Sequence, residues 1–316
     1  MAWPRSPSGD PSPMPTAIHE WLVAPVAFAL ALRHAARAFG VRRAALELAA
    51  LCAYGFALEW VAMAVFGSHR YRDTWVLAPA GVPVAIAVVW AAVIVSAMAT
   101  AVRAGASSPW HRAALAAALG ISLDLTMEPV AARLGLWEWT PHGPWLDVPI
   151  GNFVGWAVIV GGYTLGAELW PGTGALVGDA LRRITLAAAA IAALVAVGLV
   201  WKATNAERLF EGPGGWIAWA VLAASPLLLA RVHTAASTDP ASSFAARLGA
   251  TPGVGPALVF AIVGLTFAVD AFTLGGRDLA LVTMATILAL ASTLRYRRTW
   301  AHQKRAPDSL GRELPT

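Results

Sequence analysis

Residues 120–156 read GISLDLTMEPVAARLGLWEWTPHGPWLDVPIGNFVGW. This stretch places two acids, Asp124 and Glu128, inside an apolar segment, and a loop rich in Trp and Pro follows. On a helix, side chains four positions apart project from the same face. A carboxylate in hydrocarbon is costly unless it keeps its proton, finds a partner or faces a polar cavity. The stretch therefore predicts a membrane helix with a buried acidic face.

The composition of the whole chain supports this interpretation. Hydrophobic residues make up 58% of the 316 and charged residues 13%, and the mean hydropathy is +0.62. These values are typical of a protein that crosses the membrane several times. The net charge is +5, but the basic residues stand in short runs between apolar segments, so no nucleic-acid partner is expected. The single cysteine, Cys52, offers neither a disulfide framework nor a cysteine-based metal site.

Apolar segments long enough to cross a bilayer occur about nine times. They lie near 17–38, 44–66, 82–103, 113–134, 152–170, 184–201, 215–232, 257–274 and 278–295. We predict an all-α, polytopic integral membrane helix bundle of about seven to nine transmembrane helices, spanning residues 17–298. A Pro- and Ser-rich tail, 1–16, is expected to be disordered. The segment 233–256 is predicted to be a cytoplasmic linker, and 299–316 a basic cytoplasmic tail.

The basic residues predict the orientation of these spans. With nine spans, sixteen of the 23 Lys and Arg residues fall on the side that carries the C-terminus. The positive-inside rule then places the C-terminus in the cytoplasm and the N-terminus outside. The expected location is the cell membrane.

The candidate site residues share one predicted depth, near the outer surface. The acids within spans are Glu59, Asp124 and Glu128; in or beside the loops lie Tyr71, Arg72, Asp73, Trp137, Trp139, Asn152 and Trp156. If the helices are neighbours, these side chains would build one cavity. Ionisable residues inside a membrane are functional candidates by default.

Structural interpretations of the same residues remain open. Glu59 could form an ion pair with Arg72, and Arg72 with Asp73 could be a plain interfacial pair. The Trp residues fit an aromatic interface belt as well as a binding wall. Asn152 follows Pro149 and could simply cap the fifth span.

The motifs that are missing narrow the chemistry. Seven histidines are scattered without the clusters of a di-iron site. The sequence has no dinucleotide-binding G-x-G-x-x-G after a strand, no P-loop and no G-x-S-x-G elbow. Cofactor-free acid–base chemistry on a lipid-soluble molecule remains, as does transport.

Two segments carry a family resemblance. Residues 59–90 hold an intramembrane Glu and a Gly-Val-Pro before a Trp-bearing span; residues 124–156 hold an Asp, an acid-Pro pair, a Trp-x-Trp and Val-Pro-x-x-Asn-Phe-x-Gly-Trp. In these features the chain resembles the membrane carotenoid biosynthesis family, whose best-known members are the carotenoid 1,2-hydratases. The family pattern has Asp-Pro where this chain has Glu128-Pro129, so the acid is kept with a reach one methylene longer.

The resemblance implies hydration of the terminal double bond of an acyclic carotenoid without a cofactor. Glu128 or Asp124 would donate the proton, and the other acid or Glu59 would orient water. The faces of Trp137, Trp139 or Trp156 would stabilise the carbocation. Lycopene-cyclase-like ring closure, proton-coupled transport and a lipid-binding scaffold are the alternatives. The expected partners are the carotenoid, membrane lipid and other carotenoid enzymes.

Overall fold

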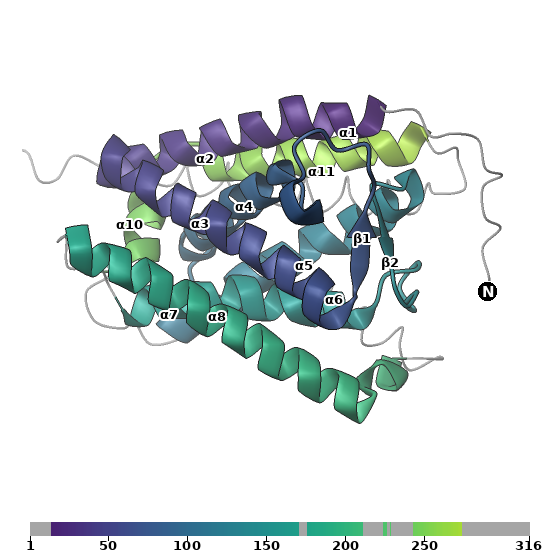
Figure 1. The fold of residues 1–316 in the computed structure, drawn as a ribbon. Helices are drawn as coiled ribbons and strands as arrows, with labels where there is room; N and C mark the ends of the chain where they lie inside the picture. Colours follow the sequence, from purple (N-terminus) through teal and green to yellow (C-terminus); the bar gives the residue numbers. More distant parts are fainter. Residues whose placement is uncertain (1–13, 171–175, 211–223, 226–227, 229–242, 274–316) are drawn as a thin grey trace, which may run out of the picture.

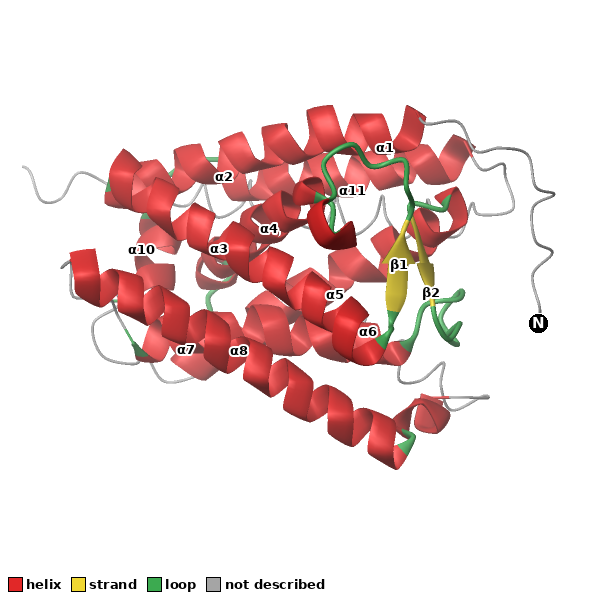
Figure 2. Ribbon diagram, viewed as in Figure 1, coloured by secondary structure: helices red, strands yellow, loops and turns green. Residues whose placement is uncertain are grey.

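The computed structural model describes residues 14–170, 176–210, 224–225, 228 and 243–273. This part of the chain is almost entirely helical (Figure 2) and holds seven helical segments that are long and apolar enough to cross a membrane. The all-α, multi-span prediction is confirmed. The expected span 278–295 and tail 299–316 lie outside the described residues, as does the expected span 215–232 apart from three positions. Of the tail 1–16, only the start of the first helix is described.

The structure describes the following elements. In order they are α1 (Met14–Ile18), η1 (His19–Val23), α2 (Ala24–Phe39), α3 (Val41–Val61), η2 (Ala62–Phe66), β1 (His69–Tyr71), η3 (Pro79–Gly81), α4 (Val84–Arg103), α5 (Pro109–Leu134), β2 (Trp137–Trp139), α6 (Ile150–Trp156), η4 (Ala157–Gly161), α7 (Gly162–Leu169), α8 (Leu176–Thr204), η5 (Ala206–Phe210), α10 (Phe244–Ala250) and α11 (Gly255–Thr273). Here η1, η2 and η4 are π-helical turns inside longer spans, a feature often found at functional sites.

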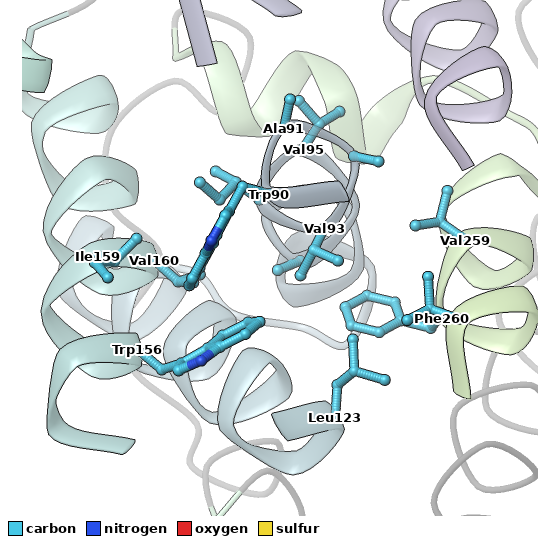
Figure 3. Close-up of a cluster of buried hydrophobic side chains, with 14 of the residues drawn as sticks. Trp90, Ala91, Val93, Val95, Leu123, Trp156, Ile159, Val160, Val259 and Phe260 are labelled. Carbon is cyan, nitrogen blue, oxygen red and sulfur yellow. The ribbon is translucent and has the colours of Figure 1, made fainter. Parts of the chain in front are cut away.

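Helices α4 and α5 form the centre of the bundle. The α5 span is the most buried of the seven, with 89% of the residues in its most apolar stretch buried. Helix α4 packs against α2, α3, α5 and α11. Trp90 of α4 and Trp156 of α6 are in contact, with ring centroids 4.1 Å apart and ring planes tilted by 34° (Figure 3). By contrast, only 11% of the residues in the corresponding stretch of α8 are buried, and this helix lies along the outside of the bundle (Figure 1). The helix that carries Asp124 and Glu128 is therefore enclosed by others.

Buried ion pairs hold together the opposite end of the bundle from β1 and β2. Arg112 of α5 donates to Glu168 of α7 at 2.7 Å. Glu47 of α3 pairs with Arg182 and Arg183 of α8, at 2.7 and 3.1 Å. A buried charge that loses its partner is strongly destabilising. These pairs therefore fix the registers of α5 and α8 at this end.

The predicted linker 233–256 is wrong in its second half. Residues 244–250 form α10, whose side chains Phe244 and Leu248 are buried. His34 hydrogen-bonds the carbonyl oxygen of Leu248, and the Arg103 guanidinium donates to backbone carbonyls at the end of α10 and after it. The segment is helical because it buries apolar surface, and its carbonyls accept hydrogen bonds from His34 and Arg103.

Candidate active site

Two short strands close one end of the bundle. Strand β1 follows the second span and β2 follows α5, and they pair antiparallel with His69 opposite Trp139 and Tyr71 opposite Trp137. Successive side chains in a strand point to opposite faces. These four aromatic residues are accordingly buried, whereas the intervening Arg70 and Glu138 are exposed. The alternation turns four aromatic side chains toward the bundle interior.

Glu59, near the end of α3, lies beneath these strands and has three polar side-chain partners. Its Oε1 accepts from Trp90 Nε1 at 2.6 Å, and its Oε2 accepts from the Tyr71 hydroxyl at 3.0 Å. His69 Nε2 lies 3.1 Å from the same Oε2. Burial, together with the nearby Glu59 charge, raises the pKa of Tyr71 well above its ordinary value, so Tyr71 acts as a hydrogen-bond donor. The structural interpretation of Glu59 as an Arg72 partner does not hold, because its partners are these three side chains.

The hydrogen bonds of His69 place a proton between its ring and Glu59. Ser68 has one hydroxyl proton, and its Oγ donates to the carbonyl oxygen of Ala62 at 3.1 Å. His69 Nδ1, 2.9 Å from Ser68 Oγ, is therefore the donor in that contact. His69 Nε2 then faces Glu59 Oε2, and one proton must lie on either atom. Glu59 and His69 thus share a hydrogen bond between a carboxylate oxygen and an imidazole nitrogen.

Glu128 lies on α5 beside this pair. Its Oε2 accepts hydrogen bonds from two indole N–H groups, Trp137 Nε1 at 2.7 Å and Trp139 Nε1 at 3.1 Å. Both donors come from β2, so the strand that closes the bundle also orients the acid. His69 is close enough to Glu128 to act on it electrostatically. The Trp-x-Trp spacing places two donors on one carboxylate oxygen.

Asp124 lies one helical turn before Glu128 and is completely buried. Its Oδ2 accepts a hydrogen bond from Asn152 Nδ2 at 2.7 Å, and its carboxyl group interacts directly with that of Glu128. Its Oδ1 is buried without a hydrogen-bond partner among the described residues. Asn152 therefore does not cap its helix, which starts after Pro149 without a side-chain cap; it links α6 to the acidic pair on α5.

Pro129 explains how the loop after β2 is attached to α5. Proline has no backbone N–H, so the carbonyl oxygen of Leu125, four residues earlier, has no partner within the helix. Trp145 of the loop donates its Nε1 to that oxygen at 3.0 Å. The acid-Pro pair thus combines the acid with an anchor for the loop over the site.

These side chains surround a cavity of about 360 Å³. Its polar and aromatic lining includes Glu59, His69, Tyr71, Trp75, Trp90, Glu128, Trp137, Trp139, Asn152 and Trp156. All three π-helical turns border it, through His19, Ala62 and Ile159 among others. At one edge the lining residues Thr140, Pro141, Lys202 and Asn205 are exposed. The remaining wall is largely apolar, so the cavity suits a hydrocarbon group with a few polar atoms at one point.

The structure brings most of the predicted site residues together. Seven line the cavity: Glu59, Tyr71, Glu128, Trp137, Trp139, Asn152 and Trp156. Asp124 lies behind Glu128 and does not reach the cavity surface. Arg72 and Asp73 are exposed and outside the lining. The Arg72 guanidinium instead covers Gly135, the left-handed residue that ends α5, where a Cβ would overlap it.

Two lining residues that contact Glu59, His69 and Trp90, were not among the predicted site residues. His69 was one of seven scattered histidines, but the alternation His-Arg-Tyr, matched by Trp-Glu-Trp, contains the strand signal that would have placed it. Trp90 stands alone in an apolar span and carries no such signal. Among the described residues, no group of three or more His, Cys, Asp or Glu side chains is placed to hold a metal ion.

Comparison with known proteins assigns a family to this arrangement. A family model described as "Carotenoid biosynthesis protein" matches residues 20–210, well over half of the chain. The matched part includes Glu59, Asp124 and Glu128 but not α11. Neither the curated proteins nor the solved structures give a match.

Proposed function

The chain belongs to the carotenoid biosynthesis protein family, and we propose that it adds water across the terminal 1,2 double bond of an acyclic carotenoid end group. The observation that carries this proposal is Glu128: a buried carboxyl group that faces an apolar, Trp-lined cavity and contacts a second carboxyl group. An isolated trisubstituted alkene needs a strong proton donor, because the first step forms a tertiary carbocation. The reaction is redox-neutral, so we propose that it uses no cofactor.

Glu128 is the proposed donor because it lines the cavity and Asp124 does not. Two carboxylates in contact in a buried site cannot both be ionised, so the pair retains a proton. Asp124, held by Asn152, would keep that proton on the pair. When Glu128 gives its proton to the alkene, the indole N–H groups of Trp137 and Trp139 stabilise the carboxylate that forms.

The aromatic wall would stabilise the carbocation. The face of an aromatic ring attracts a cation through its quadrupole, most strongly for Trp. Trp156 and Trp90 contact each other within the lining, and Trp137 and Trp139 lie beside the acid. The cation would therefore form among electron-rich rings instead of in bare hydrocarbon.

Water would enter from the exposed, polar edge of the cavity and attack the cation. The new C–O bond forms at the tertiary carbon, and the Glu59–His69 pair accepts the proton that the water oxygen loses. That pair then returns a proton to Glu128, which restores the starting state. The sum is one water added and no change in the protein.

The proposed setting is the cell membrane, with the site near the outer surface and the C-terminus in the cytoplasm. The carotenoid and membrane lipid are the partners that the site requires. Contacts with other carotenoid enzymes would pass the substrate along without release.

Expression in cells that make lycopene tests the proposal. Mass analysis of the pigments should show a gain of one water per modified end, and Glu128→Gln should abolish that gain while the protein remains folded in the membrane. Pigment of unchanged mass with cyclised ends would mean that the cation closes a ring instead. Unmodified pigment would overturn the enzymatic proposal and favour transport or a scaffold.

A further inference from the structure

The cavity has a second edge that differs in chemistry from the polar one. Phe66 of η2 and Leu194, Val197 and Gly198 of α8 line the cavity and are each only half-buried. A residue that both lines a cavity and is partly exposed lies at its mouth. These four residues are apolar, and α8 is the least enclosed span of the bundle. This edge therefore faces the place where lipid would lie.

The contact at this edge is an aromatic ring on a glycine. The tip of the Phe66 ring lies so close to Gly198 that a Cβ there would be only 2.7 Å from Phe66 Cζ. Only a residue without a side chain leaves room for the ring. At the far end of the same two spans, Glu47 of α3 is fixed to Arg182 and Arg183 of α8 by buried ion pairs. The two spans are thus joined by ion pairs at one end, and at the cavity the Phe66 ring packs on Gly198.

The cavity is too small for a whole carotenoid. A space of about 360 Å³ is in the range that encloses a drug-sized molecule. A carotenoid is a rigid, extended polyene comparable in length to the hydrocarbon core of a bilayer, about 30 Å. Only its end group fits among the Trp rings, and the rest must leave through an opening that accepts hydrocarbon.

We infer that the polyene leaves the cavity sideways into the membrane between η2 and α8, past Phe66 and Gly198. The inference rests on the proposed function for the identity of the substrate. Displacement of the Phe66 ring from Gly198 would open the passage, and the ion pairs at the other end would keep α3 and α8 together while it is open. Water and polyene would then use different edges of one cavity.

Gly198→Leu tests the inference because it fills the notch that receives the ring. We expect the KM for a full-length acyclic carotene to rise about tenfold or more, the effect of forcing extra carbon into a filled space. A short isoprenoid hydrocarbon with the same terminal group fits inside the cavity, so its kinetics should stay near those of the wild type. Gly162→Leu is the matched control, since Gly162 is exposed on α7 with open space around it.

A second variant and a binding measurement separate the possible outcomes. Phe66→Ala combined with Gly198→Leu should restore binding of the full-length carotene, because the lost ring makes room for the leucine. Carotene that co-purifies with Glu128→Gln measures binding without turnover, and Gly198→Leu should lower the amount bound in that background. If Gly198→Leu affects long and short hydrocarbons equally, or neither, the passage is elsewhere. If carotene binds through this edge and the wild type still adds no water, the passage holds and the proposed hydration fails.

Discussion

The sharpest prediction concerns the hydrogen bond from Trp137 to Glu128. Trp137→Phe keeps an aromatic ring against Tyr71 but removes the indole N–H that lies 2.7 Å from Glu128 Oε2. In the proposed reaction that oxygen becomes part of a carboxylate when the proton leaves. The lost hydrogen bond therefore acts mainly on the transition state, and turnover should fall while substrate binding changes little.

The size of the effect follows from the charge on the acceptor. A hydrogen bond to a charged group contributes about 1.5–3 kcal/mol, and about 1.4 kcal/mol corresponds to a factor of ten in rate. We therefore expect turnover to fall by about 10- to 150-fold. Trp139→Phe should have a smaller effect, because its bond to the same oxygen is longer, at 3.1 Å.

The assay is the initial rate of hydrated pigment formation in isolated membranes, normalised to the amount of folded protein. Trp145→Phe is the matched control, because the Trp145 N–H bonds the backbone carbonyl of Leu125 and not an acid. It should lower stability and leave turnover per folded molecule unchanged. A Trp137→Phe protein that turns over as fast as the wild type would refute the idea that Glu128 becomes charged during the reaction.

Three further predictions concern stability. Arg112→Ala removes the ion-pair partner of the buried Glu168 carboxylate and should lower the free energy of unfolding by about 3–5 kcal/mol, measured by thermal unfolding in detergent. The control Arg70→Ala breaks an exposed ion pair and should lower it by less than about 1 kcal/mol. Asn152→Ala removes the donor to Asp124 and should lower stability by about 1–3 kcal/mol in the same melt, and an unchanged midpoint would show that this bond is unimportant. Burial raises the pKa of Tyr71 in the folded protein, so above a pH of about 10 the tyrosine ionises first in the unfolded chain. The stabilisation by Tyr71 is therefore complete below that pH and is lost as the pH rises above it. The melting temperature of Tyr71→Phe should therefore fall less steeply above that pH, and parallel pH profiles would contradict this.

The sequence was sufficient to predict the seven described spans and to place three acids within them. Long apolar runs dictate membrane helices, and a carboxyl group in such a run needs a reason to be there, so Glu59, Asp124 and Glu128 were identifiable from chemistry alone. What each acid touches was not predictable, because the partners come from other helices. Asp124 and Glu128 have the same local pattern, yet only Glu128 reaches the cavity.

Residues beside the site were harder to place. Arg72 and Asp73 directly follow the inward-facing Tyr71, but the strand ends there and both side chains face outward. His69 was missed for the opposite reason: its role depends on the pairing of β1 with β2, across a long separation in sequence. Helix α10 was assigned to a linker, because a segment of seven helical residues is too short to stand out from its polar surroundings.

The missing N–H of Pro129 has a consequence for redesign. In a regular helix the backbone carbonyls accept hydrogen bonds from the helix itself, but the Leu125 carbonyl of α5 accepts one from outside. Trp145 donates this hydrogen bond and so anchors the loop that covers the cavity. The covering loop, residues 140–149, can therefore be redesigned without changing any transmembrane segment, provided that a tryptophan remains at position 145. The space between this loop and the acidic side chains could then be varied while the acids stay in place.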